Sequence, residues 1–174
     1  MSAAVARLRA GVDVAASVWE RVAASHETRI ELFKVLDSVG QLKLFPQNWR
    51  NWDAFAASEM VCWLCHPSEL GREPGQLEKM EVLTTDTKDG EISLYVWRFR
   101  NEDDKESVPW YASGPAKEEW YAGVSGGYIL TGEPRPLHGQ HTFSNFEKWD
   151  NATPEGHASS TLEVVSQLFR GSDE

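Results

Sequence analysis

The feature that most constrains the fold is a pair of β-type stretches in the middle of the chain. Residues 80–86 and 91–99 are rich in β-forming side chains, and Thr87-Lys-Asp-Gly90 separates them. Asp-Gly between two such stretches is a strong signal for an antiparallel hairpin. Residues 91–99 are apolar on both faces over part of their length, which is typical of a strand with neighbours on both sides. The sequence therefore predicts a sheet in which 91–99 is a central strand.

Further strands are predicted after this hairpin. Residues 108–113 and 120–125 have a β-type composition, and 128–131 continues the second of them after a turn or bulge at Gly126-Gly127. Residues 132–157 are rich in Gly, Pro, His and Asn, and are predicted as a long irregular connection. Long irregular connections are uncommon in compact domains and often carry function.

The chain before the hairpin has a helical pattern. Residues 2–24 are predicted as one helix, because apolar residues recur there at alternating spacings of three and four: Val5, Leu8, Val12, Ala15, Trp19 and Val22. This apolar seam stops at the next two positions, which are His26 and Arg29. We expect the seam to pack against the body of the same chain. A dimer formed through this N-terminal helix is the alternative.

Two more helices are predicted before the sheet. The second lies between Ser25, a good N-cap residue, and Gly40, a residue type favoured just beyond a helix end. The third begins at an asparagine cap, either Asn48 or Asn51, and runs to about His66, where the following proline ends it.

A final helix is predicted from residues 159–160 to Gly171, followed by a polar tail at 172–174. The order of elements indicates an α+β fold: N-terminal helices packed on a mostly antiparallel sheet, closed by a C-terminal helix. A length of 174 residues fits one domain. That domain has a helical part, 1–66, and a β-rich part with the C-terminal helix, 67–171.

Charge and composition disfavour several classes of function. The formal net charge is −10, so binding of nucleic acid or of an anionic membrane surface is not expected. The sequence has no run of 18 apolar residues and no signal-peptide pattern, and its two cysteines are too few for a disulfide framework. A cytoplasmic location is predicted. No nucleotide-binding loop, nucleophile elbow or zinc-protease motif is present, so an enzyme is not the favoured hypothesis.

Two pairs of residues could nevertheless bind a metal ion. Cys62-Trp-Leu-Cys65 and His138-Gly-Gln-His141 together supply the four ligands of a tetrahedral zinc site. A metal-binding (Zn) protein or enzyme using these pairs is therefore the alternative function. The competing interpretation is that both cysteines lie in the third helix as small buried hydrophobic residues.

Glu59 is the residue of the third helix that its pattern does not explain. On a helical wheel Glu59 falls within the broad apolar arc, with Cys62 and His66 beside it. A carboxylate that is buried there must be paired, or its pKa must be raised. Glu59 and His66 are therefore candidates for an unrecognised site.

Aromatic residues are a second unusual feature of the chain. Six of them gather in the β-rich part: Trp97, Trp110, Tyr111, Trp120, Tyr121 and Tyr128. An exposed row of this kind can stack on sugars or contact a protein, whereas a buried row forms a bulky core. An aromatic-lined binder of glycans or small ligands is thus the third functional hypothesis.

One segment resembles a known family. Phe45-Pro-Gln-Asn-Trp-Arg-Asn-Trp-Asp-Ala-Phe55, with the helix before it, resembles the barstar-type ribonuclease inhibitors over about residues 30–57. In that family a proline after a helix is followed by Asn-Leu/Trp-Asp-Ala-Leu at the start of the next helix. The resemblance implies that Asp53 faces the basic site of a ribonuclease. Ala57 stands at the family's second acidic position.

These observations favour a non-enzymatic, acidic module that binds another protein without a cofactor. An immunity- or antitoxin-like inhibitor of a basic partner protein is its concrete form, because an acidic surface can steer association with a basic active site. The predicted contact residues lie at the start of the third helix and in the acidic loop after the central strand: Trp49, Trp52, Asp53, Glu102, Asp103 and Asp104.

Overall fold

The structure is a computed structural model that describes residues 2–66, 70–87, 90–100, 120–137, 142–150, 153–159 and 163. Its internal contacts divide the chain into two compact units. The helical unit comprises Met1–Glu59 and Glu133–Pro136, and the sheet unit comprises Met60–Gly132 and Leu137–Glu174. That the two units together form one domain stays a prediction.

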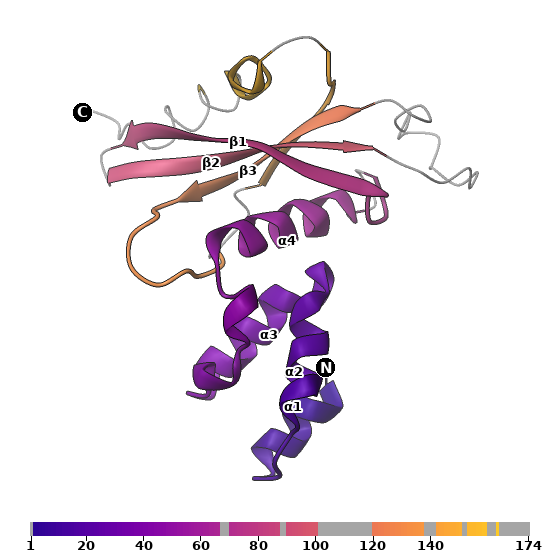
Figure 1. Cartoon of the computed structure of the whole chain (residues 1–174), viewed down its shortest axis with the longest axis vertical. Coiled ribbons are helices and arrows are strands. Elements are labelled where there is room, and N and C mark those ends of the chain that lie inside the picture. Colours follow the sequence, from indigo (N-terminus) through magenta and orange to yellow (C-terminus); the bar gives the residue numbers. More distant parts are fainter. Residues whose placement is uncertain are drawn as a thin grey trace. The chain divides into compact units, whose positions relative to one another are not determined.

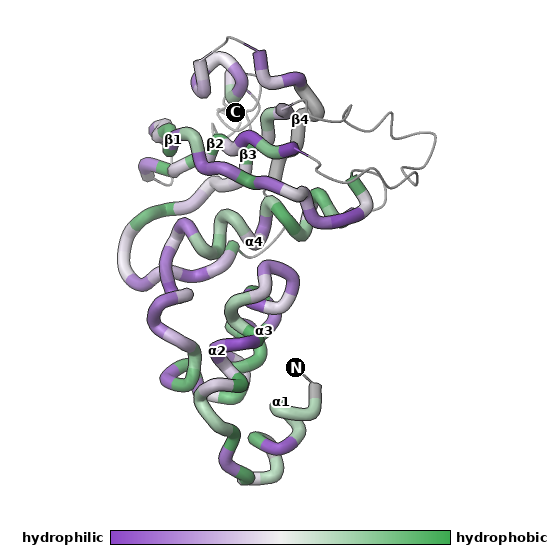
Figure 2. Tube along the Cα trace, turned by 45° about the vertical axis from the view of Figure 1, so that its right-hand side comes forward, coloured by the Kyte–Doolittle hydropathy of each residue, from purple (hydrophilic) through white to green (hydrophobic). Residues whose placement is uncertain are grey.

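The helical unit is built from short helices that follow one another closely (Figure 1). They are α1 (Ser2–Arg9), α2 (Ala16–Ala24), α3 (His26–Ser38), the 3₁₀ turns η1 (Leu42–Leu44) and η2 (Gln47–Trp49), and the first part of α4 (Trp52–Leu64). Hydrophilic and hydrophobic residues are mixed along α2 and α3 (Figure 2), as expected of helices with one apolar side.

The prediction of a single N-terminal helix is wrong, because Gly11 ends α1. Gly11 has a φ of 71°, which a glycine adopts without strain. Its N–H donates to the Leu8 carbonyl at 3.0 Å, and the Val12 N–H donates to the Arg7 carbonyl at 2.9 Å. This pair of bonds is a Schellman cap, which satisfies the last carbonyls of the helix. Gly40 ends α3 in the same way, as predicted.

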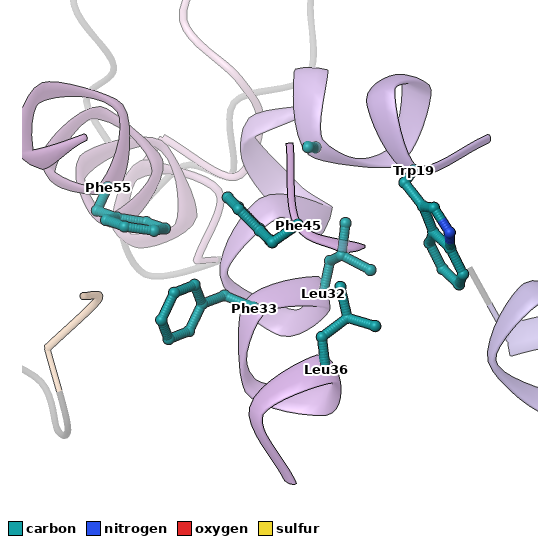
Figure 3. Packing of buried hydrophobic residues seen from close by; sticks show 7 residues of the cluster. Trp19, Leu32, Phe33, Leu36, Phe45 and Phe55 are labelled. Carbon is teal, nitrogen blue, oxygen red and sulfur yellow. The ribbon is translucent and has the colours of Figure 1, made fainter. Parts of the chain in front are cut away.

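The core of the helical unit gathers side chains from α2, α3, the turns and α4: Trp19, Ala23, Leu32, Phe33, Leu36, Phe45 and Phe55. Figure 3 shows the three phenylalanine rings together on one side of α3. Their centroids are 5.2–5.9 Å apart, in edge-on and tilted arrangements that aromatic rings favour. Leu8 and Val22 also pack against this cluster, so much of the predicted apolar seam faces its own chain.

A distant segment completes the helical unit. Residues Glu133–Pro136 belong to it, although they follow the third strand in the sequence. The Arg50 guanidinium donates a hydrogen bond to the Glu133 carboxylate and lies over the Phe33 ring, with 5.9 Å between Cζ and the ring centroid. Pro136 is buried. An ion pair therefore links this segment to the rest of the helical unit.

The sheet unit contains a four-stranded sheet in the order β1-β2-β3-β4. The strands are β1 (Gln76–Thr87), β2 (Gly90–Arg100), β3 (Tyr121–Tyr128) and β4 (Thr142–Lys148), and each pair of neighbours is antiparallel. β2 is buried continuously from Ile92 to Trp97, which confirms the predicted central strand. The pairing shifts register at Gly126-Gly127, where a turn or bulge was expected.

β4 lies within the segment predicted to be irregular. Its register against β3 shifts between Ala122 and Val124, which pair with Glu147 and Phe143. Four residues of β4 therefore run against two of β3. This irregularity disrupts the two-residue alternation by which a strand is recognised in a sequence.

Helical segments cover both faces of the sheet within the sheet unit. The Met60 side chain of α4 lies against Gly123 of β3, while Ala158 packs with Val96 and Val124. Gly123 and Val124 are consecutive residues of one strand, so they face opposite sides. Residues 154–159, which include Ala158, are helical (yellow in Figure 1), and the Met60 end of α4 lies on the Gly123 side. The α+β prediction is confirmed, although this closing helix starts earlier than expected.

Candidate functional site

Asn51 fixes the first turn of α4. Its Oδ1 accepts a hydrogen bond from the Ala54 N–H at 2.8 Å, and its Nδ2 donates to the Asn48 carbonyl at 2.9 Å. Asn51 is therefore the N-cap, one of the two candidates from the sequence. Asp53 follows in the first turn, where the helix dipole favours a negative charge, and it is exposed. The cap thus holds a solvent-exposed carboxylate on a rigid turn.

Arg29 ties this turn to the preceding helices from inside the helical unit. Its side chain lies in the core, with 1% of the residue exposed. Nε donates to the Ala23 carbonyl at 2.7 Å, and Nη2 donates to the Ala24 carbonyl at 3.1 Å. Nη1 donates to the Ala54 carbonyl at 2.7 Å and to Ser58 Oγ at 2.8 Å. One guanidinium thereby binds the last carbonyls of α2 and the first half of α4.

Arg29 also holds one of the predicted contact residues. Its Cζ lies 4.4 Å from the centre of the Trp49 ring, a cation–π distance. Trp49 is half-buried and packs against the aromatic core. Trp52, the first residue of α4, is also half-buried. We call Trp49, Trp52 and Asp53 the α4 entry surface, which combines two partly exposed indoles with one exposed carboxylate.

His26 lies beside the buried guanidinium. Its Nδ1 is 3.4 Å from Arg29 Nη1. Burial of the imidazole, and then the positive charge of Arg29, lower the pKa of His26 below its ordinary value. His26 therefore resists protonation in the folded chain.

Lowering the pH is expected to destabilise the helical unit through His26. Below an unfolded-state pKa of about 6.5, the unfolded chain binds a proton at His26 that the folded chain resists, so stability falls as the pH decreases toward the folded pKa. Urea unfolding of wild type and His26→Gln at pH 7.5 and about 5.5 measures this. The variant should lose less stability on acidification. An exposed control, His66→Gln, should behave like wild type, and an identical pH response in His26→Gln would contradict the prediction.

The predicted metal ligands are only partly placed. His138 and His141, like the acidic residues Glu102, Asp103 and Asp104, lie outside the described residues. Both cysteines are at the end of α4, but Cys62 is exposed and Cys65 is half-buried, so the expectation of two buried cysteines is wrong. In the described part of the chain, no three His, Cys, Asp or Glu side chains gather into a group that could hold a metal ion. The zinc hypothesis stays a prediction.

Glu59 is half-buried rather than buried. His66 is exposed and stacks against Trp63, with ring centroids 6.4 Å apart. Met60, Val61 and Leu64 form the buried side of this part of the helix. The end of α4 thus presents Cys62 and His66 to solvent.

The six aromatic residues of the β-rich part do not form one exposed row. Trp97 and Tyr128 are buried, and Trp97 Nε1 donates to Ser125 Oγ at 2.7 Å. These two rings cannot stack on a ligand. Trp120 and Tyr121 are half-buried, and Trp110 and Tyr111 lie outside the described residues.

A group of charged side chains surrounds Trp120 and was not predicted from the sequence. The Cζ atoms of Arg98 and Arg100 lie 4.5 and 5.0 Å from the centre of its ring. Arg98 donates two hydrogen bonds, of 2.8 and 2.6 Å, to Glu78 on the neighbouring strand. The spacing of Arg98 and Arg100 along one strand was the only available signal, because residues 101–119 separate these arginines from Trp120 in the sequence.

Comparison with family models, with curated proteins and with solved structures finds no match to this chain. Among the residues that the structure describes, no helix has the length and apolar character needed to span a membrane. The functional interpretation therefore depends on the geometry of the sites described above.

Proposed function

We propose that this chain is a protein-binding module that contacts a basic partner protein through the α4 entry surface, as an immunity- or antitoxin-like inhibitor would. The observation that carries the proposal is the exposed Asp53 on a capped turn, next to the half-buried Trp49 and Trp52. Tryptophans in partly buried, rigid positions are frequent hot spots of protein interfaces. A preorganised surface also loses little conformational entropy on binding.

The charge distribution places the net negative charge in one unit and the proposed contact surface in the other. Of the 17 basic and 27 acidic residues in the chain, eight of each belong to the helical unit. The sheet unit has the remaining nine basic and nineteen acidic residues, and therefore the whole net charge of −10. Such a charge attracts a basic protein over long range and raises its association rate. The contact surface itself belongs to the neutral unit.

Replacing the Asp53 carboxylate is expected to weaken capture of a basic partner. Affinity capture from cell extract, quantified by mass spectrometry, is compared for wild type, Asp53→Asn and Asp37→Asn. Asp37 is an equally exposed carboxylate in the last turn of α3 and serves as the matched control. We expect proteins of high isoelectric point to be retained by wild type and Asp37→Asn. Asp53→Asn should weaken binding by about 10- to 100-fold, as for a charged hot spot.

A small basic ribonuclease provides a defined probe for the same surface, because of the resemblance at residues 45–55. Inhibition of RNA hydrolysis by wild type, and its loss in Asp53→Asn, would support the inhibitor form of the proposal. If wild type and Asp53→Asn capture the same proteins in equal amounts, the α4 entry surface is not the contact site.

A further inference from the structure

We propose that Cys62 and Cys65 form a reversible intramolecular disulfide when the chain meets a low-molecular-weight disulfide such as oxidised glutathione. Both thiols are reduced in the structure. Cys62 lies in the last turn of α4, and Cys65 follows directly after its final residue, Leu64. This inference is independent of the proposed function, because neither cysteine belongs to the α4 entry surface.

The backbone places the two cysteines within reach of each other. The Cys65 N–H still donates to the Val61 carbonyl at 2.9 Å, so Cys65 remains on the helical path. Residues three apart on such a path have Cα atoms about 5 Å apart, given the helix rise and radius. Disulfides need about 4.4–6.8 Å between Cα atoms. The separation is therefore suitable without movement of the rest of the helix.

For a disulfide to form, the Cys62 and Cys65 side chains need a tighter turn than the α-helix provides. The chain makes such a turn one residue further on. The His66 N–H donates to the Trp63 carbonyl at 2.9 Å, which is a bond between residues three apart. A 3₁₀ turn makes such bonds and brings side chains three apart onto the same side. If the Cys65 N–H donated to the Cys62 carbonyl instead of the Val61 carbonyl, the same turn would bring the Cys62 and Cys65 sulfurs together.

Exposure assigns the two cysteines different roles. Cys62 is exposed and can be reached by a small disulfide, whereas Cys65 is half-buried. The Cys62 thiol loses its proton to solvent, and its thiolate attacks the small disulfide to form a mixed disulfide, releasing one small thiolate. The Cys65 thiolate then attacks the Cys62 sulfur and releases the second. Two protein thiols are oxidised, and one small disulfide is reduced to two thiols once the thiolates take up the protons.

Oxidation is coupled to the end of α4. The Leu64 carbonyl, between the cysteines, accepts hydrogen bonds from the N–H groups of Leu70 at 3.0 Å and Gly71 at 2.9 Å. Leu64 itself is fully buried. Tightening the turn disturbs these bonds, so we expect the oxidised chain to be the less stable form and its disulfide to be readily reduced.

The test treats the reduced full-length chain with oxidised glutathione in the presence of EDTA and measures intact mass. We expect wild type to become two hydrogens lighter and to revert with dithiothreitol. Cys65→Ser should stop at the mixed disulfide on Cys62, and Cys62→Ser should react at least about tenfold more slowly. The oxidised wild type should unfold at lower urea than the reduced chain. A wild type that stops at the mixed disulfide, or stays reduced while Cys62 reacts with a maleimide, would overturn the proposal.

Discussion

Replacing Arg29 by methionine is expected to destabilise the helical unit by about 3–5 kcal/mol, because several backbone carbonyls lose a charged hydrogen-bond donor. Methionine fills much of the same space, but it donates no hydrogen bond. The buried Ala23 carbonyl and the part-buried carbonyls of Ala24 and Ala54 would then lose their donor. Each buried acceptor left unpaired costs about 1–3 kcal/mol. The positive charge that offsets the C-terminal dipole of α2 would also be lost.

Urea unfolding followed by circular dichroism measures this loss, and amide hydrogen exchange locates it in α2 and α3. Arg21→Met is the matched control, since Arg21 is exposed in the last turn of α2. We expect this control to change stability by less than about 0.5 kcal/mol. Arg29→Lys should remain strongly destabilised, because a single ammonium group cannot reach carbonyls on both helices. A loss below about 1 kcal/mol in Arg29→Met would show that the guanidinium contributes little.

Replacing Gly126 by alanine is expected to destabilise the sheet unit by a similar amount, about 3–5 kcal/mol. Gly126 has a φ of 143°, a region that is essentially restricted to glycine. A Cβ atom there would lie 2.6 Å from the Ser93 carbonyl oxygen and 2.9 Å from Leu94 Cα. Both are backbone atoms of β2, so relief requires movement of the central strand.

Gly132→Ala separates the effect of backbone strain from that of crowding. Gly132 also has a positive φ, 76°, but a Cβ there meets no atom within 4 Å. We expect a loss of about 1–2 kcal/mol for this control, from the left-handed backbone alone. Urea unfolding followed by circular dichroism measures both losses, and amide hydrogen exchange in β2 locates them in the sheet. Equal losses in the two variants would show that the approach to β2 is unimportant.

The elements with clear local signals were predicted from the sequence. The Asp-Gly hairpin, the central strand and the caps at Gly40 and Asn51 depend on residue type at one position or on short-range alternation. Glycine is unfavourable within a helix, and Gly11 lies in the middle of residues 2–24, yet the regular apolar seam on both sides of it predicts one helix. The seam continues in register across the break, so periodicity alone cannot reveal the Schellman cap.

The site was harder to predict, because its organising residue is a buried cation. Arg29 marked the end of the apolar seam in the sequence, and a charged residue in that position is normally exposed. The structure buries it because carbonyls from α2 and α4 converge on its guanidinium. These acceptors belong to the backbone and have no signature in the sequence. The residues of the α4 entry surface could be selected only because they lie in a recognisable motif.

The attachment of Glu133–Pro136 to the helical unit has a consequence for the order of folding during synthesis. The helical unit begins at the N-terminus, but its Arg50–Glu133 ion pair needs a residue that is translated after β1, β2 and β3. Domains made from one continuous segment can fold as soon as they leave the ribosome. Here the aromatic core comes from residues 19–55, so the first helices can assemble early, but the Arg50–Glu133 ion pair can form only after the three strands have been made.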